Sequence, residues 1–122
     1  MTTKTKILLA GIWITLSEFF RNEIILKNFW IDHYGNLNLK FETLPINGIL
    51  WTVWSFLLAI FIFKLSQKFS KFETIMITWL VSFLMMWITL YNLQVFPISI
   101  LSIAIPLSIF EVYLSYVIVK RN

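Results

Sequence analysis

Residues 48–63 read GILWTVWSFLLAIFIF, an apolar run without a charge that decides the class of this protein. A helix needs about 17 to 25 residues to cross a bilayer, and this run approaches that length. Three further apolar runs, 7–26, 72–91 and 98–119, reach it. Across the chain 59% of the residues are hydrophobic and 13% are charged, whereas about 25% are charged in soluble domains. The sequence therefore predicts an all-α integral membrane four-helix bundle with up-down topology.

Length and residue types narrow the class of function. The 122 residues leave room for one transmembrane domain, residues 1–122, and no separate soluble domain. The chain has no cysteine, which excludes thiolate catalysis and Cys-ligated metals. Its net charge of +4 lies between the apolar runs, so it indicates topology and no nucleic-acid partner. The expected partners are the lipid bilayer and either a second copy of the chain or another membrane subunit.

The positions of the basic residues predict the topology. Cytoplasmic loops are enriched in lysine and arginine. Seven of the ten basic residues would lie on one side: Lys4, Lys6, Lys64, Lys68, Lys71, Lys120 and Arg121. We therefore expect both termini to be cytoplasmic and the protein to be multi-pass, in the plasma (inner) membrane of a prokaryote. The first run is the weakest span, and a cleaved signal peptide is its alternative, although no small-x-small cleavage site follows it.

Small and polar residues recur along each span at steps of three and four, as close helix contact in lipid requires. This spacing predicts a left-handed bundle, with most bulky Phe, Trp, Leu and Ile side chains facing lipid. The stripes are Gly11, Thr15, Glu18 and Asn22; Gly48, Thr52, Ser55 and Ala59; Thr78, Ser82, Met85, Thr89 and Asn92; and Ala104, Ser108, Glu111 and Ser115.

Two acids lie inside apolar spans, where an ionisable side chain costs a few kcal/mol. A rise of 1.5 Å per residue places Glu18 about 16 Å and Glu111 about 12 Å from the cytoplasmic boundary, so the two carboxylates share a level. Arg21 follows one turn after Glu18. The candidate intramembrane binding or proton site at this level consists of Glu18, Arg21, Asn22, Ser55, Ser82, Ser108 and Glu111.

Two interpretations of this layer remain open. The charges and hydroxyls could only fix helix register, because polar groups in lipid find partners across helices. Alternatively, two acids and one base leave a carboxylate without a counter-charge, and its proton or counter-ion could be exchanged for a substrate.

The outer loop 28–46 is unusually aromatic and is expected to rest on the membrane surface. Apolar and polar residues alternate over 37–42, which predicts a short strand. His33, the only histidine, is interpreted as an interfacial residue, with a pH-sensing lid as the alternative. A lone His–Asp pair predicts no metal site. The candidate outer vestibule comprises His33, Asn47, Trp51, Tyr91 and Asn92.

The predicted layout has four spans in 122 residues, with Ser17-Glu18-Phe19 in the first span. It resembles that of the small multidrug resistance transporters. In that family the corresponding glutamate is essential. This chain departs from the pattern by Arg21, the second acid Glu111, a longer first outer loop and a charge bias that disfavours antiparallel dimers. We therefore carry over no function from the resemblance.

Two functions are compatible with the sequence. One is a small proton- or cation-coupled carrier or channel-like protein that uses the midplane carboxylates. The other is a non-transporting accessory, scaffold or immunity-type membrane subunit whose buried charges fix helix packing. The chain contains no phosphate-binding glycine loop, complete nucleophile set or haem ligand pair, so we predict no enzymatic activity and no cofactor.

Overall fold

A computed structural model describes residues 1–41 and 44–121, and within these ranges the chain is helical without a strand. The prediction of an all-α chain is confirmed. The α-helices are α1 (Thr3–Phe19), α2 (Lys27–Asn36), α3 (Pro45–Ser66), α4 (Lys71–Trp79), α5 (Met85–Asn92) and α6 (Leu101–Lys120). Two π-helical segments, η1 (Phe20–Ile25) and η2 (Leu80–Leu84), and a 3₁₀ turn, η3 (Ile98–Ile100), connect them.

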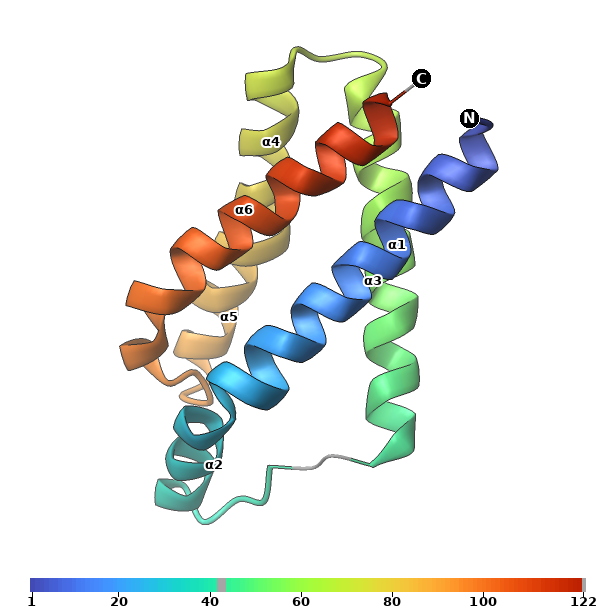
Figure 1. The fold of residues 1–122 in the computed structure, drawn as a ribbon. Helices are drawn as coiled ribbons and strands as arrows, with labels where there is room; N and C mark the ends of the chain where they lie inside the picture. The colour runs from blue at the N-terminus through green and yellow to red at the C-terminus, as the bar shows by residue number, and fades with distance from the viewer. Residues whose placement is uncertain (42–43, 122) are drawn as a thin grey trace.

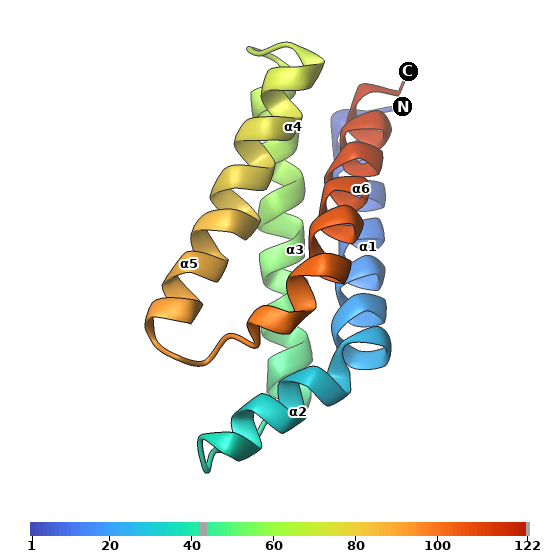
Figure 2. The same cartoon turned by 90° about the vertical axis from the view of Figure 1, so that its left-hand side faces the viewer.

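The long helices lie side by side with both chain termini at one end, which we call the terminal end (Figure 1). The opposite end, where α2 lies, is called the far end. Helix α1 packs against α3 and α6, and α4 packs against α6 and α3. Seen from the side, α5 leans away from α6 toward the far end (Figure 2). The first and last long helices are therefore neighbours.

In the described part of the chain, three helical segments are long and apolar enough to cross a membrane: Pro45–Ser66, Lys71–Asn92 and Ile98–Lys120. These segments indicate a membrane protein, and each begins or ends within three residues of its predicted bounds. The first helical segment starts at Thr3, four residues before the predicted span, and is not among the three. A fourth span and cytoplasmic termini therefore remain predictions.

The π-helical turn η2 changes which residues of the third span face the interior. The buried positions are Thr74, Thr78, Phe83 and Trp87, at steps of four, five and four. The predicted stripe continued from Thr78 through Ser82, Met85, Thr89 and Asn92, but Ser82 is half-buried and the other three are exposed. This prediction was wrong because a π-turn takes up an extra residue and rotates everything after it.

Aromatic side chains form much of the interior at the far end. Phe83 and Trp87 are buried, and Trp54, Trp79 and Phe96 lie within edge-to-face or tilted ring distance of them. The expectation that these bulky residues would face lipid was wrong. Edge-to-face ring contacts stabilise such a cluster beyond its buried area.

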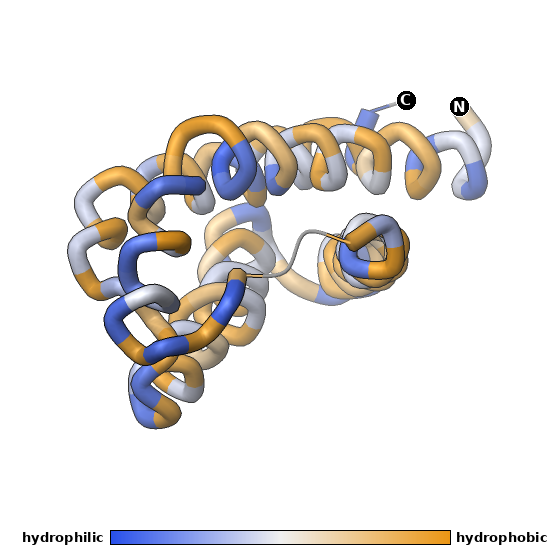
Figure 3. The backbone as a smooth tube through the Cα atoms, turned by 90° about the horizontal axis from the view of Figure 1, so that it is seen from below, coloured by the Kyte–Doolittle hydropathy of each residue, from blue (hydrophilic) through white to orange (hydrophobic). Residues whose placement is uncertain are grey.

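The predicted outer loop, residues 28–46, contains the helix α2, which the sequence pattern did not predict. Residues 37–41 form a turn and irregular chain, which contradicts the predicted strand there, while residue 42 lies outside the described residues. Asn38 has φ of 57° and ends the helix, with Leu39 N–H donating to Tyr34 O. This left-handed turn suits asparagine and breaks the extended pattern. Many hydrophilic residues gather on α2 and the segment after it (Figure 3).

Helices α1 and α3 come into close contact near their middles. The Phe56 ring covers Gly11, where a Cβ atom would lie only 2.4 Å from the ring. Ala10, Ile14 and Ala59 are fully buried beside this contact. Gly11 thus permits the close approach, as small residues do between helices in lipid.

Candidate functional site

One guanidinium joins the two buried acids. Arg21 Nη2 lies 2.6 Å from Glu18 Oε2, and Arg21 Nη1 lies 3.4 Å from Glu111 Oε1. The side chains are 5%, 3% and 0% exposed, respectively. The structure therefore brings Glu18, Arg21 and Glu111 into one cluster inside the protein.

The three side chains belong to three different helical segments. Glu18 lies in the last turn of α1, Arg21 in η1 and Glu111 in the middle of α6. The Arg21 guanidinium lies 5.1 Å from the ring centroid of Phe83 in η2, within the range of a cation–π interaction. The two π-helical turns thus meet at Arg21. Such turns are frequent at functional sites.

A polar chain extends the cluster toward the far end. Asn22 Nδ2 donates to Glu18 Oε2 over 3.1 Å, and Trp30 Nε1 of α2 donates to Asn22 Oδ1 over 3.2 Å. Glu18 Oε2 therefore accepts hydrogen bonds from both Arg21 and Asn22. These bonds hold the Glu18 carboxyl group in place and tie α2 to it.

The helix that carries Glu111 is fixed by bonds to its backbone. The carbonyl oxygen of Glu111 accepts from Trp13 Nε1 over 3.0 Å and from Ser115 Oγ over 2.7 Å. The first bond connects α1 directly to α6 at the level of the acid. Both bonds leave the carboxyl group of Glu111 free to interact with Arg21.

Each acid keeps one carboxyl oxygen without a partner among the described residues: Glu18 Oε1 and Glu111 Oε2. Two carboxylates would carry two negative charges against the single charge of Arg21. A buried charge without a partner is costly, and so is a buried polar atom without a hydrogen bond. One further positive charge, a proton or a cation, would therefore make the cluster neutral.

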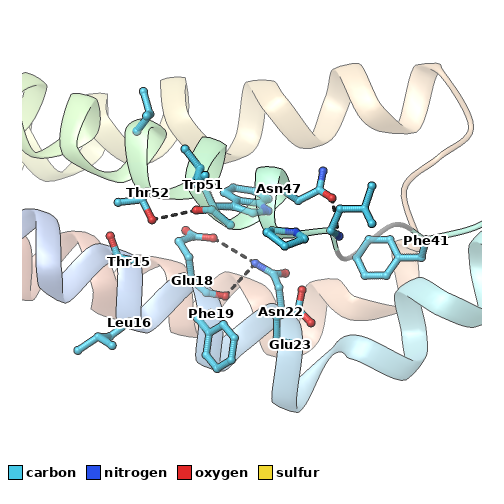
Figure 4. Close-up of a pocket in the computed structure, with 15 residues that line it drawn as sticks. Thr15, Leu16, Glu18, Phe19, Asn22, Glu23, Phe41, Asn47, Trp51 and Thr52 are labelled. Carbon is cyan, nitrogen blue, oxygen red and sulfur yellow. Dashed lines mark hydrogen bonds between the residues drawn. The ribbon is translucent and has the colours of Figure 1, made fainter.

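Glu18 also lines a cleft between α1 and α3, at the far end (Figure 4). The cleft has a volume of about 800 Å³, at the upper end of the range for small-molecule sites. Polar side chains in its wall are Thr15, Glu18, Asn22, Glu23, Asn47 and Thr52. Its apolar wall includes Leu16, Phe19, Phe41, Ile49, Trp51 and Val53.

The predicted serines Ser55 and Ser108 bond to other partners than the acids. Ser55 donates to Trp51 O of its own helix, and Ser108 donates to Ile105 O and accepts from Trp79 Nε1 over 2.8 Å. Ser82 is half-buried beside Trp54 and Leu58 in a small surface depression. The structure shows no hydrogen bond from these serines to the acids among the residues it describes.

The predicted outer vestibule separates into two places. Asn47 and Trp51 line the cleft, whereas Tyr91 and Asn92 are exposed at the end of α5. His33 Nε2 lies 2.9 Å from Gln94 O and connects α2 to the turn after α5. His33 thus takes part in a helix-to-turn contact.

Sequence reasoning missed Phe83, Trp30 and Trp13 as neighbours of the acids. All three are aromatic residues, which we expected to meet lipid. A usable signal existed in Trp13, since an indole N–H in an apolar span needs an acceptor. No comparable signal predicts Phe83, because the π-turn that brings it inward leaves no mark in the hydrophobic pattern.

The described residues contain no group of three or more His, Asp or Glu side chains that could hold a metal ion. The polar atoms at hand are instead suited to a proton, an ammonium group or another hydrogen-bond donor. No family model, curated protein or solved structure matches the chain, so the likeness in layout to the small multidrug resistance transporters finds no support in these comparisons.

Proposed function

We propose that this protein is a small proton- or cation-coupled membrane carrier in which Glu18 and Glu111 hold an exchangeable positive charge. The observation that carries the proposal is the position of Glu18. One of its carboxyl oxygens binds Arg21 and Asn22, while the side chain also lines the cleft. A proton on the acid pair and a solute in the cleft would therefore compete for the same group.

Competition of this kind couples two binding events. A proton neutralises the spare charge when the cleft holds no solute. A solute with a positively charged or hydrogen-bond donating group would take over that role at Glu18 Oε1, and the proton would leave. By linkage, each of the two ligands lowers the affinity for the other by the same factor.

The membrane arrangement that we propose has four spans, with α1 and η1 as the first. Buried Arg21 and Glu18 make this segment less apolar than the other three, and their mutual pairing offsets much of the cost in lipid. The lysine bias favours termini in the cytoplasm, and we propose the inner membrane of a prokaryote. The cleft would then open on the outer half of the membrane.

A second candidate is a non-transporting subunit whose charges only lock the helices together. The bonds between Trp30, Asn22, Glu18, Arg21 and Glu111 favour it, because they link α1, η1, α2 and α6 through buried polar contacts. In that case the acids would hold a fixed charge and the cleft would be filled by lipid.

Infrared difference spectroscopy distinguishes the two candidates. We expect a carboxyl band that changes between mildly acidic and mildly alkaline pH and is lost in Glu18→Gln and in Glu111→Gln. The matched control is Glu23→Gln, which changes an acid in the cleft wall whose ion pair, within the described residues, is with half-exposed Lys27. A wild-type spectrum with no titrating carboxyl band would rule out the carrier and leave the structural subunit.

A further inference from the structure

Two buried hydroxyl groups of α4 differ from the other buried hydroxyls in the described residues. Ser55, Ser66, Ser108 and Ser115 each donate to a carbonyl oxygen three or four residues earlier in their own helix, over 2.7 to 2.9 Å. Thr74 Oγ1 and Thr78 Oγ1 are fully buried and have no partner among the described residues.

Three other threonines in the described helices bond to the backbone of their own helix. A threonine in a helix commonly donates to the carbonyl four residues earlier, and Thr15, Thr52 and Thr89 do so here. Because Thr74 and Thr78 do not, their hydroxyls remain available for another partner. A buried hydroxyl without a hydrogen bond costs about 1 to 3 kcal/mol.

The two threonines lie in α4, which packs against α6, the helix that carries Glu111. They are one helical turn apart on one face of α4, about 6 Å along its axis. Thr74 lies one turn from the start of α4 at Lys71. Beyond Thr78, Trp79 donates to Ser108 of α6, one turn from Glu111.

Glu111 contributes a third unpaired atom to this part of the protein, Oε2. Buried water typically makes two to four hydrogen bonds to polar groups that lack other partners. The charged groups near Glu111 are Glu18 and Arg21 on the side of α1 and η1, and Lys71 stacks on Tyr113 near the terminal end.

We propose that Thr74 and Thr78 bind a short file of water molecules through which protons reach Glu111 from the terminal end. This inference rests on the proposed function and adds a direction to it. The solute reaches Glu18 through the cleft at the far end, and the proton reaches Glu111 between α4 and α6. The two ligands of the acid pair would then use opposite sides of the membrane.

The test follows the carboxyl infrared band in vesicles after a jump of the external pH, with the protein oriented by selection on a C-terminal tag. With the terminal end outward, Thr74→Val/Thr78→Val should slow the response about tenfold, the equivalent of roughly one lost hydrogen bond in the barrier. Thr74→Ser/Thr78→Ser restores the hydroxyls and should restore the rate. Thr89→Val, which removes an exposed hydroxyl bonded to its own helix, should leave the rate unchanged.

The outcomes separate the two proposals. A wild-type protein without a responding carboxyl band contradicts the proposed function itself. A band that responds at the wild-type rate in the valine variant contradicts the water file alone. A valine variant with a raised melting temperature also contradicts it, because removal of a dry, unpaired hydroxyl stabilises a protein. With the far end outward, we expect the valine and wild-type proteins to respond at the same rate.

Discussion

The two halves of the contact between α1 and α3 differ in how closely the helices approach. Near the middle of both helices the Phe56 ring lies on Gly11, and from there toward the terminal end Ala59 and Ile62 are fully buried. At the far end the same two helices enclose the cleft beside Glu18. Gly48, near the start of α3, has no atom within 4 Å of the place a Cβ would occupy.

This difference shows which of the two glycines is needed for close helix contact. Gly11 and Gly48 both belong to stripes of small residues, yet only Gly11 is needed for contact. Apolar packing closes the terminal half, while beside the open half Arg21 and the two acids join α1 and η1 to α6 through charge. An open cleft beside a buried acid is thus combined with a closed helix pair that keeps it in place.

Loss of Arg21 should have the largest effect, since it removes the charge that joins α1 and η1 to α6 beside the cleft. We expect Arg21→Ala to lower the free energy of unfolding by about 3 to 5 kcal/mol, because uncompensated buried carboxylates remain. Addition of Glu18→Gln should recover part of the loss. Denaturation in detergent measures both effects.

The control for Arg21 is Lys27→Ala, which breaks the half-exposed contact with Glu23 at 3.7 Å. Exposed ion pairs contribute about 0 to 1 kcal/mol, so this variant should remain close to wild type. Equal losses for Arg21→Ala and Lys27→Ala would show that the buried cluster does not stabilise the contact of α1 and η1 with α6.

A smaller effect is expected at the closed half of the same helix pair. Gly11→Ala forces the Phe56 ring away and should destabilise the protein by about 1 to 3 kcal/mol, the cost of overpacking. Gly48→Ala meets open space and should stabilise the helix by roughly 0.5 to 1 kcal/mol. Thermal unfolding of the pair compares them directly, and equal shifts in one direction would contradict the difference between the halves.

Much of this arrangement follows from the sequence for simple physical reasons. Hydropathy predicts the spans because each must match the thickness of the bilayer. The shared level of Glu18 and Glu111 follows from helix rise alone, and in the structure a single arginine contacts both.

Other features depend on tertiary contacts that the pattern does not encode. The π-turn η2 moves Phe83 and Trp87 inward and Met85 outward, although the spacing of small residues predicted the reverse. Hydrogen bonds from Trp30 to Asn22 and between His33 and Gln94 hold helix α2 in place. His33 and Gln94 are 61 residues apart in the sequence, so no local pattern predicts their contact. The cleft arises where two helices separate, which no single segment reveals.

Cysteine labelling on α3 tests the central claim, that the cleft admits solutes to Glu18 from the far end. Thr52 and Ala59 lie one heptad apart on the same helix, the first in the cleft wall and the second in the closed contact. The chain has no native cysteine, so a single introduced thiol gives an unambiguous signal.

In vesicles, Thr52→Cys should react with membrane-impermeant thiol reagents added at the far end. A cationic reagent should react on the order of tenfold faster than an anionic one, and Glu18→Gln should reduce that preference. Ala59→Cys should not react. Equal labelling at both positions, or a preference at Thr52→Cys that is unchanged by Glu18→Gln, would contradict the account.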